Sequence, residues 1–297
     1  MVTYSNVFDN GNANVIAQMG SFQVIEHEKD LSVSSYNALS EYFASKMNIR
    51  RRQVLATLEN SGVVLQAGAM QWMSGNVQMN SGVSGVGNFL GNVAKAAVTK
   101  ESVAKPIYFG TGSVMLEPTY NHILLLNVAE WGQIVLQDGM FLACDSVLQR
   151  QVVARNNVSS AVFGGEGLFN LALSGNGILV CESPVPREEL IEIILQDDEM
   201  RIDGNMAVAW SGSLQFTVEK STKSLLGSAI SGEGLVNVYR GSGRILLAPT
   251  IKESAHSKPS DSNSDKGPSQ APTQAGGAAA QVGGALKTLG NVMDFFS

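Results

Sequence analysis

Two short phrases carry residue types that could do acid–base chemistry. Glu166 and Glu233 each stand between glycines, in the sequences GGEGLFN and SGEGLVN. A carboxylate held in such a turn could act as a general acid or base. It could also hold its own turn by accepting hydrogen bonds from backbone N–H groups. We favour the structural role and keep an enzyme that uses Glu166 or Glu233 as an alternative.

A Gly-x-Gly phrase followed by an apolar run could bind phosphate. It occurs three times, beginning at Gly110, Gly175 and Gly241. A dinucleotide fingerprint needs a third glycine and a helix after it. In GEGLFN, Asn170 takes the place of the third glycine, and strand-like residues follow. We therefore predict that the glycines serve turns, bulges or close backbone approaches, and that the protein has no cofactor.

Metal ligands and nucleophiles are scattered along the chain. His27, His122 and His256 show neither HxH nor HxxxH spacing, so no metal site is predicted. Cys144 and Cys181 each follow an apolar run, which predicts buried structural thiols in a reducing compartment. We therefore predict no catalytic residues and a protein that is not an enzyme.

Three further groups also have structural interpretations. The sequence QDDE at 196–199, with Asp203, lacks the alternating spacing of a calcium loop and is interpreted as a solvated turn. The run Arg50–Arg52 is interpreted as a solvated loop or the guard of an edge strand, with a binding patch as the alternative. The tryptophans are expected to pack in a core or a subunit interface rather than to stack a ligand: Trp72, Trp131 and Trp210.

Composition indicates what kind of elements must position these residues. Of 297 residues, 44% are hydrophobic, only 15% are charged and 31 are glycine, a balance that favours strands and tight turns. The net charge of -6 argues against nucleic acid as a partner. The N-terminus has no signal-peptide pattern and no apolar run reaches 18 residues, so we predict a cytoplasmic protein.

Internal repetition sets the fold class. A Leu-Gln phrase beginning at Leu65, Leu136 and Leu195 alternates with the Gly-x-Gly phrases. The segments between them have strand patterns, and LIEIILQ from Leu190 is apolar enough to be buried on both faces. We predict a mainly β protein, an antiparallel rolled sandwich or barrel built from about three pseudo-repeats.

The chain divides by composition into three parts. Residues 1–250 form the β-domain, with a Gly-rich insertion near 81–105 and an N-terminal helix at 32–48 whose apolar face packs across a sheet. Residues 251–280 have the composition of a disordered linker. Residues 281–297 form an amphipathic tail that could dock on a protein or a membrane through Val282, Leu286, Leu289, Val292, Met293 and Phe296.

Several of these phrases together resemble the altered-inheritance-of-mitochondria family of unknown function. They are LQAGAMQWMSGNVQM, FGTGSVMLEP, SGEGLVNVYRGSGRILLAP and the paired GEGL motifs, and the resemblance spans 55–249. The family is similar in fold to the tryptophan RNA-binding attenuator proteins. The resemblance implies a compact β-domain that self-associates and transfers no catalytic residues. This chain departs from the simplest family pattern in its N-terminal helix, its insertion and its linker with tail.

Three functional hypotheses follow. The first is a non-enzymatic scaffold or interaction protein, a homo-oligomer that docks to a partner or membrane surface through its tail. The second is a small-ligand or RNA-binding module, which rests on analogy of fold alone. The third is the enzyme that uses Glu166 or Glu233.

Overall fold

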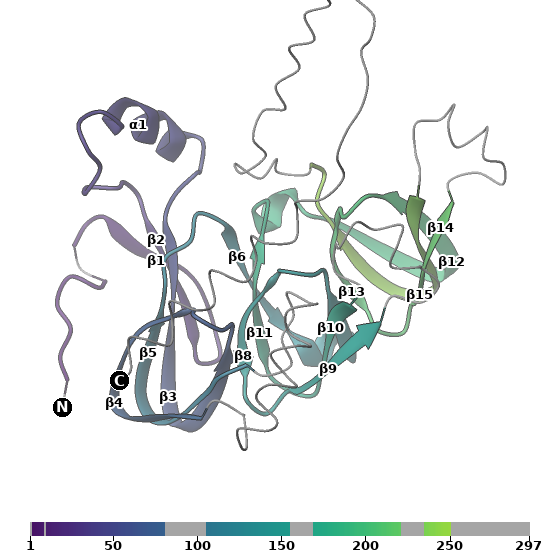
Figure 1. Cartoon of the computed structure of the whole chain (residues 1–297), viewed down its shortest axis with the longest axis horizontal. Coiled ribbons are helices and arrows are strands. Elements are labelled where there is room, and N and C mark those ends of the chain that lie inside the picture. The colour runs from purple at the N-terminus through teal and green to yellow at the C-terminus, as the bar shows by residue number, and fades with distance from the viewer. Residues whose placement is uncertain (1, 9, 81–104, 155–168, 221–234, 251–297) are drawn as a thin grey trace, which may run out of the picture. The chain divides into compact units, whose positions relative to one another are not determined.

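The computed structural model describes residues 2–8, 10–80, 105–154, 169–220 and 235–250 (Figure 1). Contacts divide the chain into two units, Met1–Lys252 and Glu253–Ser297, and all described residues belong to the first. The insertion up to residue 104, the linker 251–280 and the tail 281–297 lie outside the described residues.

The first sheet has eight strands in the order β1-β2-β3-β8-β11-β6, with β5 pairing β3 and β4. Its pairings are antiparallel, and it forms a nearly closed barrel-like sheet. Its strands are β1 (Ala13–Met19), β2 (Phe22–His27), β3 (Arg52–Leu65), β4 (Met70–Asn80), β5 (Ile107–Leu116), β6 (His122–Asn127), β8 (Phe141–Asp145) and β11 (Ile178–Ser183).

The second sheet has seven strands in the order β12-β15-β13-β7-β10-β9, with β14 pairing β15. It is also antiparallel and forms a half-barrel. The prediction of a mainly antiparallel β-fold is therefore confirmed. The strands of the second sheet are β7 (Gln133–Leu136), β9 (Gln149–Ala154), β10 (Phe169–Ser174), β12 (Ile191–Asp203), β13 (Ala207–Ser211), β14 (Gln215–Lys220) and β15 (Leu235–Leu247).

The main core joins the two sheets. One cluster of buried apolar side chains includes Leu124 and Leu179 from the first sheet and Leu136 and Leu171 from the second. A second cluster lies within the first sheet around Phe22, and a third within the second sheet around Trp210 and Tyr239. The central strand β13, with sequence AVAWS, is buried throughout. Since neighbouring side chains of a strand point to opposite faces, both faces of β13 are covered.

Strand position overrides apolar content in β12. Ile191 is 48% exposed and Ile194 is 65% exposed, so the prediction that LIEIILQ is buried on both faces was wrong. β12 pairs only with β15 among the described strands. A strand at the edge of a sheet has no neighbour on one side to cover its side chains.

The helix is shorter than predicted and does not cross a sheet. α1 spans Ala38–Lys46, and no residue in it is buried. Figure 1 shows it beyond the ends of β1 and β2. Its N-cap is Asn37, which makes no side-chain capping bond. Two short 3-10 turns complete the set of described helices: η1 (Val128–Trp131) and η2 (Arg187–Glu189).

Two of the Gly-x-Gly phrases lie inside long strands, not at turns. Gly110 in β5 has φ +132°, and a Cβ added there would come within 2.1 Å of the Asn76 carbonyl oxygen in β4. Gly241 lies in the same way within β15, with φ +110°. The third phrase, beginning at Gly175, connects β10 with β11. The glycines therefore serve backbone geometry in all three places.

The three Leu-Gln phrases adopt two different structures. The phrases at Leu65 and Leu136 lead into turns at Gly68 and Gly139, where φ is +81°. The phrase at Leu195 lies within β12, at a bulge where Asp197 has φ +54°. The interpretation of QDDE as a turn was therefore wrong, because these residues continue the strand through a bulge in which Gln196 and Asp197 lie opposite Ser242 alone.

Candidate interaction surface

The sequence singled out two groups of residues, one for catalysis and one for tail docking. Glu166, Glu233 and the six apolar residues of the tail lie outside the described residues. Their roles stay predictions. Within the described ranges, no three His, Cys, Asp or Glu side chains gather as a metal site would require.

Both cysteines are buried structural thiols, as predicted. Cys144 and Cys181 have no exposed surface. Burial raises the pKa of Cys144 to about 11 and that of Cys181 to about 12. Both thiols are therefore protonated at neutral pH and lack the thiolate that a nucleophile needs.

The histidines and tryptophans occupy separate places. His122 begins the edge strand β6, and the His27 ring forms a hydrogen bond with the Gln53 side chain at 3.1 Å. Trp210 is 2% exposed in the core. Trp131 is half-buried, with the Arg244 guanidinium 5.1 Å from its ring centre, and Trp72 is half-buried against Tyr4.

The run Arg50–Arg52 forms ion pairs, and Arg52 is buried while Arg50 and Arg51 are half-buried, which corrects the interpretation of Arg52 as solvated. Arg52 is 1% exposed, and its guanidinium lies 2.7 Å from the Glu26 carboxylate. Arg50 donates to the other oxygen of Glu26 at 2.8 Å. Arg51 lies 3.6 Å from Asp30. Buried arginine requires such partners because an unpaired charge in the interior is costly.

This cluster fixes the C-terminal end of α1 to the first sheet. Arg52 donates to the Asn48 backbone carbonyl at 3.1 Å and to its side-chain oxygen at 2.8 Å. Asn48 has φ +62°, the left-handed conformation that often ends a helix. Arg50 donates to the Ser45 carbonyl at 3.1 Å. The helix is therefore anchored at its base by β2 and β3.

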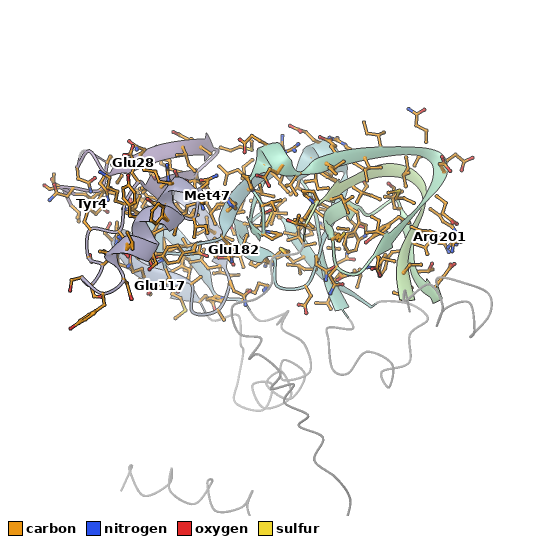
Figure 2. The ribbon with its side chains drawn as sticks, turned by 90° about the horizontal axis from the view of Figure 1, so that it is seen from above. Tyr4, Glu28, Met47, Glu117, Glu182 and Arg201 are labelled. Carbon is orange, nitrogen blue, oxygen red and sulfur yellow. The ribbon has the colours of Figure 1, made fainter. Side chains whose placement is uncertain are left out.

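The anchored helix carries an exposed apolar surface, which we call the α1 surface. Tyr36 is 96% exposed, and Met47, labelled in Figure 2, is 75% exposed. Leu39, Phe43 and Met47 follow one another at four-residue spacing and so share one face, and exposed apolar patches are typical of interaction sites. The predicted helical face is therefore present but faces outward. The α1 surface consists of Leu31, Tyr36, Leu39, Tyr42, Phe43, Met47 and Ile49.

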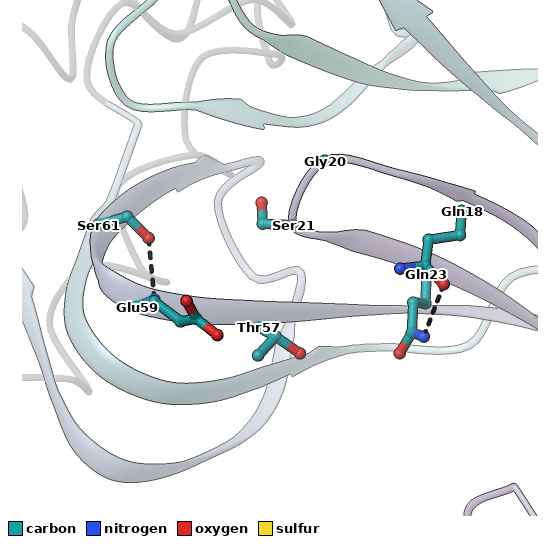
Figure 3. Close-up of a pocket in the computed structure, with 7 residues that line it drawn as sticks. All are labelled: Gln18, Gly20, Ser21, Gln23, Thr57, Glu59 and Ser61. Atoms are coloured by element: carbon teal, nitrogen blue, oxygen red, sulfur yellow. Dashed lines mark hydrogen bonds between the residues drawn. The ribbon is translucent and has the colours of Figure 1, made fainter.

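A polar hollow lies where the β1–β2 turn meets the bulge of β3 (Figure 3). It has a volume of about 430 Å³. Gln23 donates to Gln18 at its rim at 3.1 Å, and Ser61 accepts from the Glu59 backbone N–H at 3.2 Å. Its lining has one carboxylate, from Glu59, and no cation or aromatic ring. Such a lining lacks the apolar walls that usually hold an organic ligand.

Comparisons with known proteins agree on the family. A family model described as mitochondrial biogenesis AIM24 matches residues 43–250. An uncharacterized protein of Streptococcus pyogenes serotype M6 is 34% identical over 199 residues, which cover 64% of this chain and 78% of that protein. The crystal structure of protein SPYM3_0169 from Streptococcus pyogenes matches with a TM-score of 0.52 and 29% identity, covering 69% of this chain and 90% of that one.

The family match includes every described strand from β3 to β15 and the helix α1 from residue 43 onward. It confirms the resemblance carried by the glycine and Leu-Gln phrases. The chain therefore belongs to the AIM24 mitochondrial biogenesis family.

Proposed function

We propose that this protein is a non-enzymatic interaction protein, a β-domain that self-associates and presents apolar elements to a partner. The observation that carries the proposal is the α1 surface. An unanchored apolar helix would fold back onto the nearest sheet to bury its side chains. Here the Arg52–Glu26 pair holds the base of the helix while Leu39, Phe43 and Met47 stay exposed. The segment 281–297 is the second docking element of the proposal.

Membrane attachment is one form that the interaction could take. No described helix is long and apolar enough to cross a bilayer. Docking on a membrane would therefore use the α1 surface or the tail as interfacial elements. A cytoplasmic location stays a prediction.

The test replaces the exposed face of the helix and leaves the ion pairs intact. The triple variant Leu39→Gln, Phe43→Gln, Met47→Gln removes apolar side chains that are 71%, 59% and 75% exposed. We expect it to fold as the native protein does but to lose binding to liposomes. The control is Val147→Gln, because Val147 is 72% exposed but lies outside the α1 surface.

Liposome flotation and light scattering are measured for the triple variant, the control and a chain that ends at residue 250. If the triple variant matches the control in both assays, the α1 surface has no docking role. If the shortened chain matches the full chain in both, the tail has none.

The alternative functions have weaker support. The hollow of Figure 3 would suit only a small polar ligand, and the net charge of -6 leans against RNA. Catalysis by Glu166 or Glu233 is tested by replacing each with Gln once a candidate reaction is identified.

A further inference from the structure

Two long strands each have one unpaired edge within the described ranges. β4 pairs only with β5, and β12 pairs only with β15. The first has 11 residues and the second has 13. An unpaired edge presents backbone N–H and carbonyl groups that can bond to another strand.

Within the chain, two antiparallel strand pairings show how such edges are joined, and we call them the internal seams. In the first seam β3 pairs with β8, with Val64 opposite Cys144. In the second seam β7 pairs with β13, with Val135 opposite Trp210. In the first seam, β3 leads into the turn at Gly68, and its partner β8 follows the turn at Gly139. In the second seam, β7 leads into the turn at Gly139, and its partner β13 follows the turn at Gly204.

Matching backbone bonds close both seams. The Gln66 N–H donates to the Leu142 carbonyl at 2.8 Å, and the Gln137 N–H donates to the Val208 carbonyl at 3.0 Å. At the other end of each seam the bond length is 2.8 Å in both. These second bonds run from Ser146 N–H to the Gly62 carbonyl and from Gly212 N–H to the Gln133 carbonyl.

β12 is the counterpart of β3. The register of β3 against β5 shifts between Leu58 and Ser61, and that of β12 against β15 shifts between Leu195 and Asp198. Inside each bulge one residue has a left-handed backbone, Asn60 at φ +50° and Asp197 at φ +54°.

Asn60 and Asp197 each donate the backbone N–H to the hydroxyl of the middle residue of a Gly-x-Gly phrase. The acceptors are Thr111 Oγ1 at 3.1 Å and Ser242 Oγ at 2.9 Å. The offset between the bulges is 197 − 60 = 137 residues. Added to Val64, the central residue of β3 in the first seam, this offset gives Arg201 as the corresponding residue of β12.

β4 is the counterpart of β8 and β13. A Cβ on Gly177 would meet Asp145 and Leu148, and one on Gly243 would meet Ser211 and Leu214. In the same way, a Cβ on Gly112 would meet Ser74 and Val77. Ser74 therefore corresponds to Asp145 and Ser211, and the preceding residue, Met73, corresponds to Cys144 and Trp210.

We propose that β12 of one copy pairs antiparallel with β4 of a second copy, with Arg201 opposite Met73. By the pattern of the internal seams, the Asp203 N–H donates to the Gln71 carbonyl and the Gly75 N–H donates to the Glu199 carbonyl. This inference rests on the self-association proposed above and specifies where it occurs.

Exposure at the free edges agrees with this pairing. The central residues of the internal seams are buried, at 0% for Val64 and Cys144 and at most 6% for Val135 and Trp210. At the free edges Met73 is 43% exposed, and the Arg201 side chain, labelled in Figure 2, is 48% exposed.

Charge and geometry also agree with it. The sequence of β4, MQWMSGNVQMN, has no charged residue. The acidic and basic side chains of β12 would therefore meet no like charge across the seam. The two edges belong to different surfaces of the chain, so the contact is head-to-tail and builds a ring or a filament.

Disulfide trapping tests the seam. Opposed residues of an antiparallel pair have Cα atoms about 5.5 Å apart or closer, within the range that a disulfide spans. The double variant Met73→Cys, Arg201→Cys should give a ladder of disulfide-linked chains under mild oxidation, and a mixture of the two single variants should give dimers. Each single variant alone should stay unlinked, because the native cysteines are buried. The off-register control is Met79→Cys, Arg201→Cys, with Met79 53% exposed and displaced by about 20 Å along β4.

The outcomes separate this inference from the proposed function. A protein that is monomeric by light scattering overturns both. An oligomer in which the double variant links no better than the off-register control overturns the β12–β4 seam and leaves self-association standing. Dimers of Met73→Cys alone would show two β4 strands pairing with each other and would also overturn the seam.

Discussion

The ion pair at the base of α1 makes the sharpest stability prediction. Glu26→Gln keeps the side-chain shape but removes the negative charge between Arg50 and Arg52. Arg52 loses charge-assisted bonds to the carboxylate, at 2.9 Å from Nε and 2.7 Å from the terminal nitrogen. It keeps neutral acceptors only, namely Asn48, the Arg50 carbonyl and the amide oxygen of the substituted side chain.

The expected loss follows from the burial of this pair. The side chains of Glu26 and Arg52 are 11% and 2% exposed. Removing one partner of a buried pair costs about 3–5 kcal/mol, because the other charge stays uncompensated. The retained neutral acceptors place Glu26→Gln near the lower limit, at about 3 kcal/mol of unfolding free energy.

Equilibrium urea unfolding at 25 °C measures the effect. The matched control is Glu192→Gln, which breaks a 3.0 Å pair with Arg187 whose side chain is 48% exposed. We expect that control to cost less than about 1 kcal/mol. Hydrogen exchange should also quicken in residues 38–49 of the Glu26 variant, since its anchor is lost. If the two variants lose the same stability, the ion pair does not anchor the helix and the reasoning fails.

Three further predictions concern single sites. Gly110→Ala should lower the melting temperature by several degrees, because its Cβ would meet the Asn76 carbonyl oxygen at 2.1 Å; an unchanged melting curve would contradict the close approach. Both buried cysteines should resist a thiol reagent at pH 8 in the native protein and react in denaturant, since pKa values near 11 and 12 leave at most roughly one thiol in a thousand ionised; rapid native labelling would show that they are accessible. A hydrogen bond from Arg240 lowers the pKa of Glu219, so Arg240→Gln should raise that pKa toward its ordinary value in an NMR titration; an unmoved pKa would assign the shift to another group.

Much of the β architecture could be predicted from local pattern. The glycine phrases, the short apolar runs and the low charge all indicate antiparallel strands, and the structure has them. The buried cysteines could be predicted for the same reason, since each follows a run of apolar residues. These signals depend on a few neighbouring positions in the sequence.

The errors occurred where a distant partner decides the outcome. Arg52 is buried because Glu26 lies beside it in the neighbouring strand, 26 residues earlier, and no local pattern shows that pairing. The helix face was expected to cover a sheet, but the anchoring of its base holds it away. Ile194 is exposed because β12 is an edge strand, which depends on the order of strands in the sheet.

The unpaired edges of β4 and β12 also needed the structure. The sequence shows repeated Leu-Gln phrases, but the third one lies at a bulge within β12, whereas the first two lead into turns. Only the backbone bonds reveal which strands correspond to one another.

The solution molar mass of the full chain tests the central claim most directly. Sedimentation equilibrium over a range of protein concentrations should give a multiple of the 31.5 kDa chain mass. A mass of one chain at every concentration would contradict self-association.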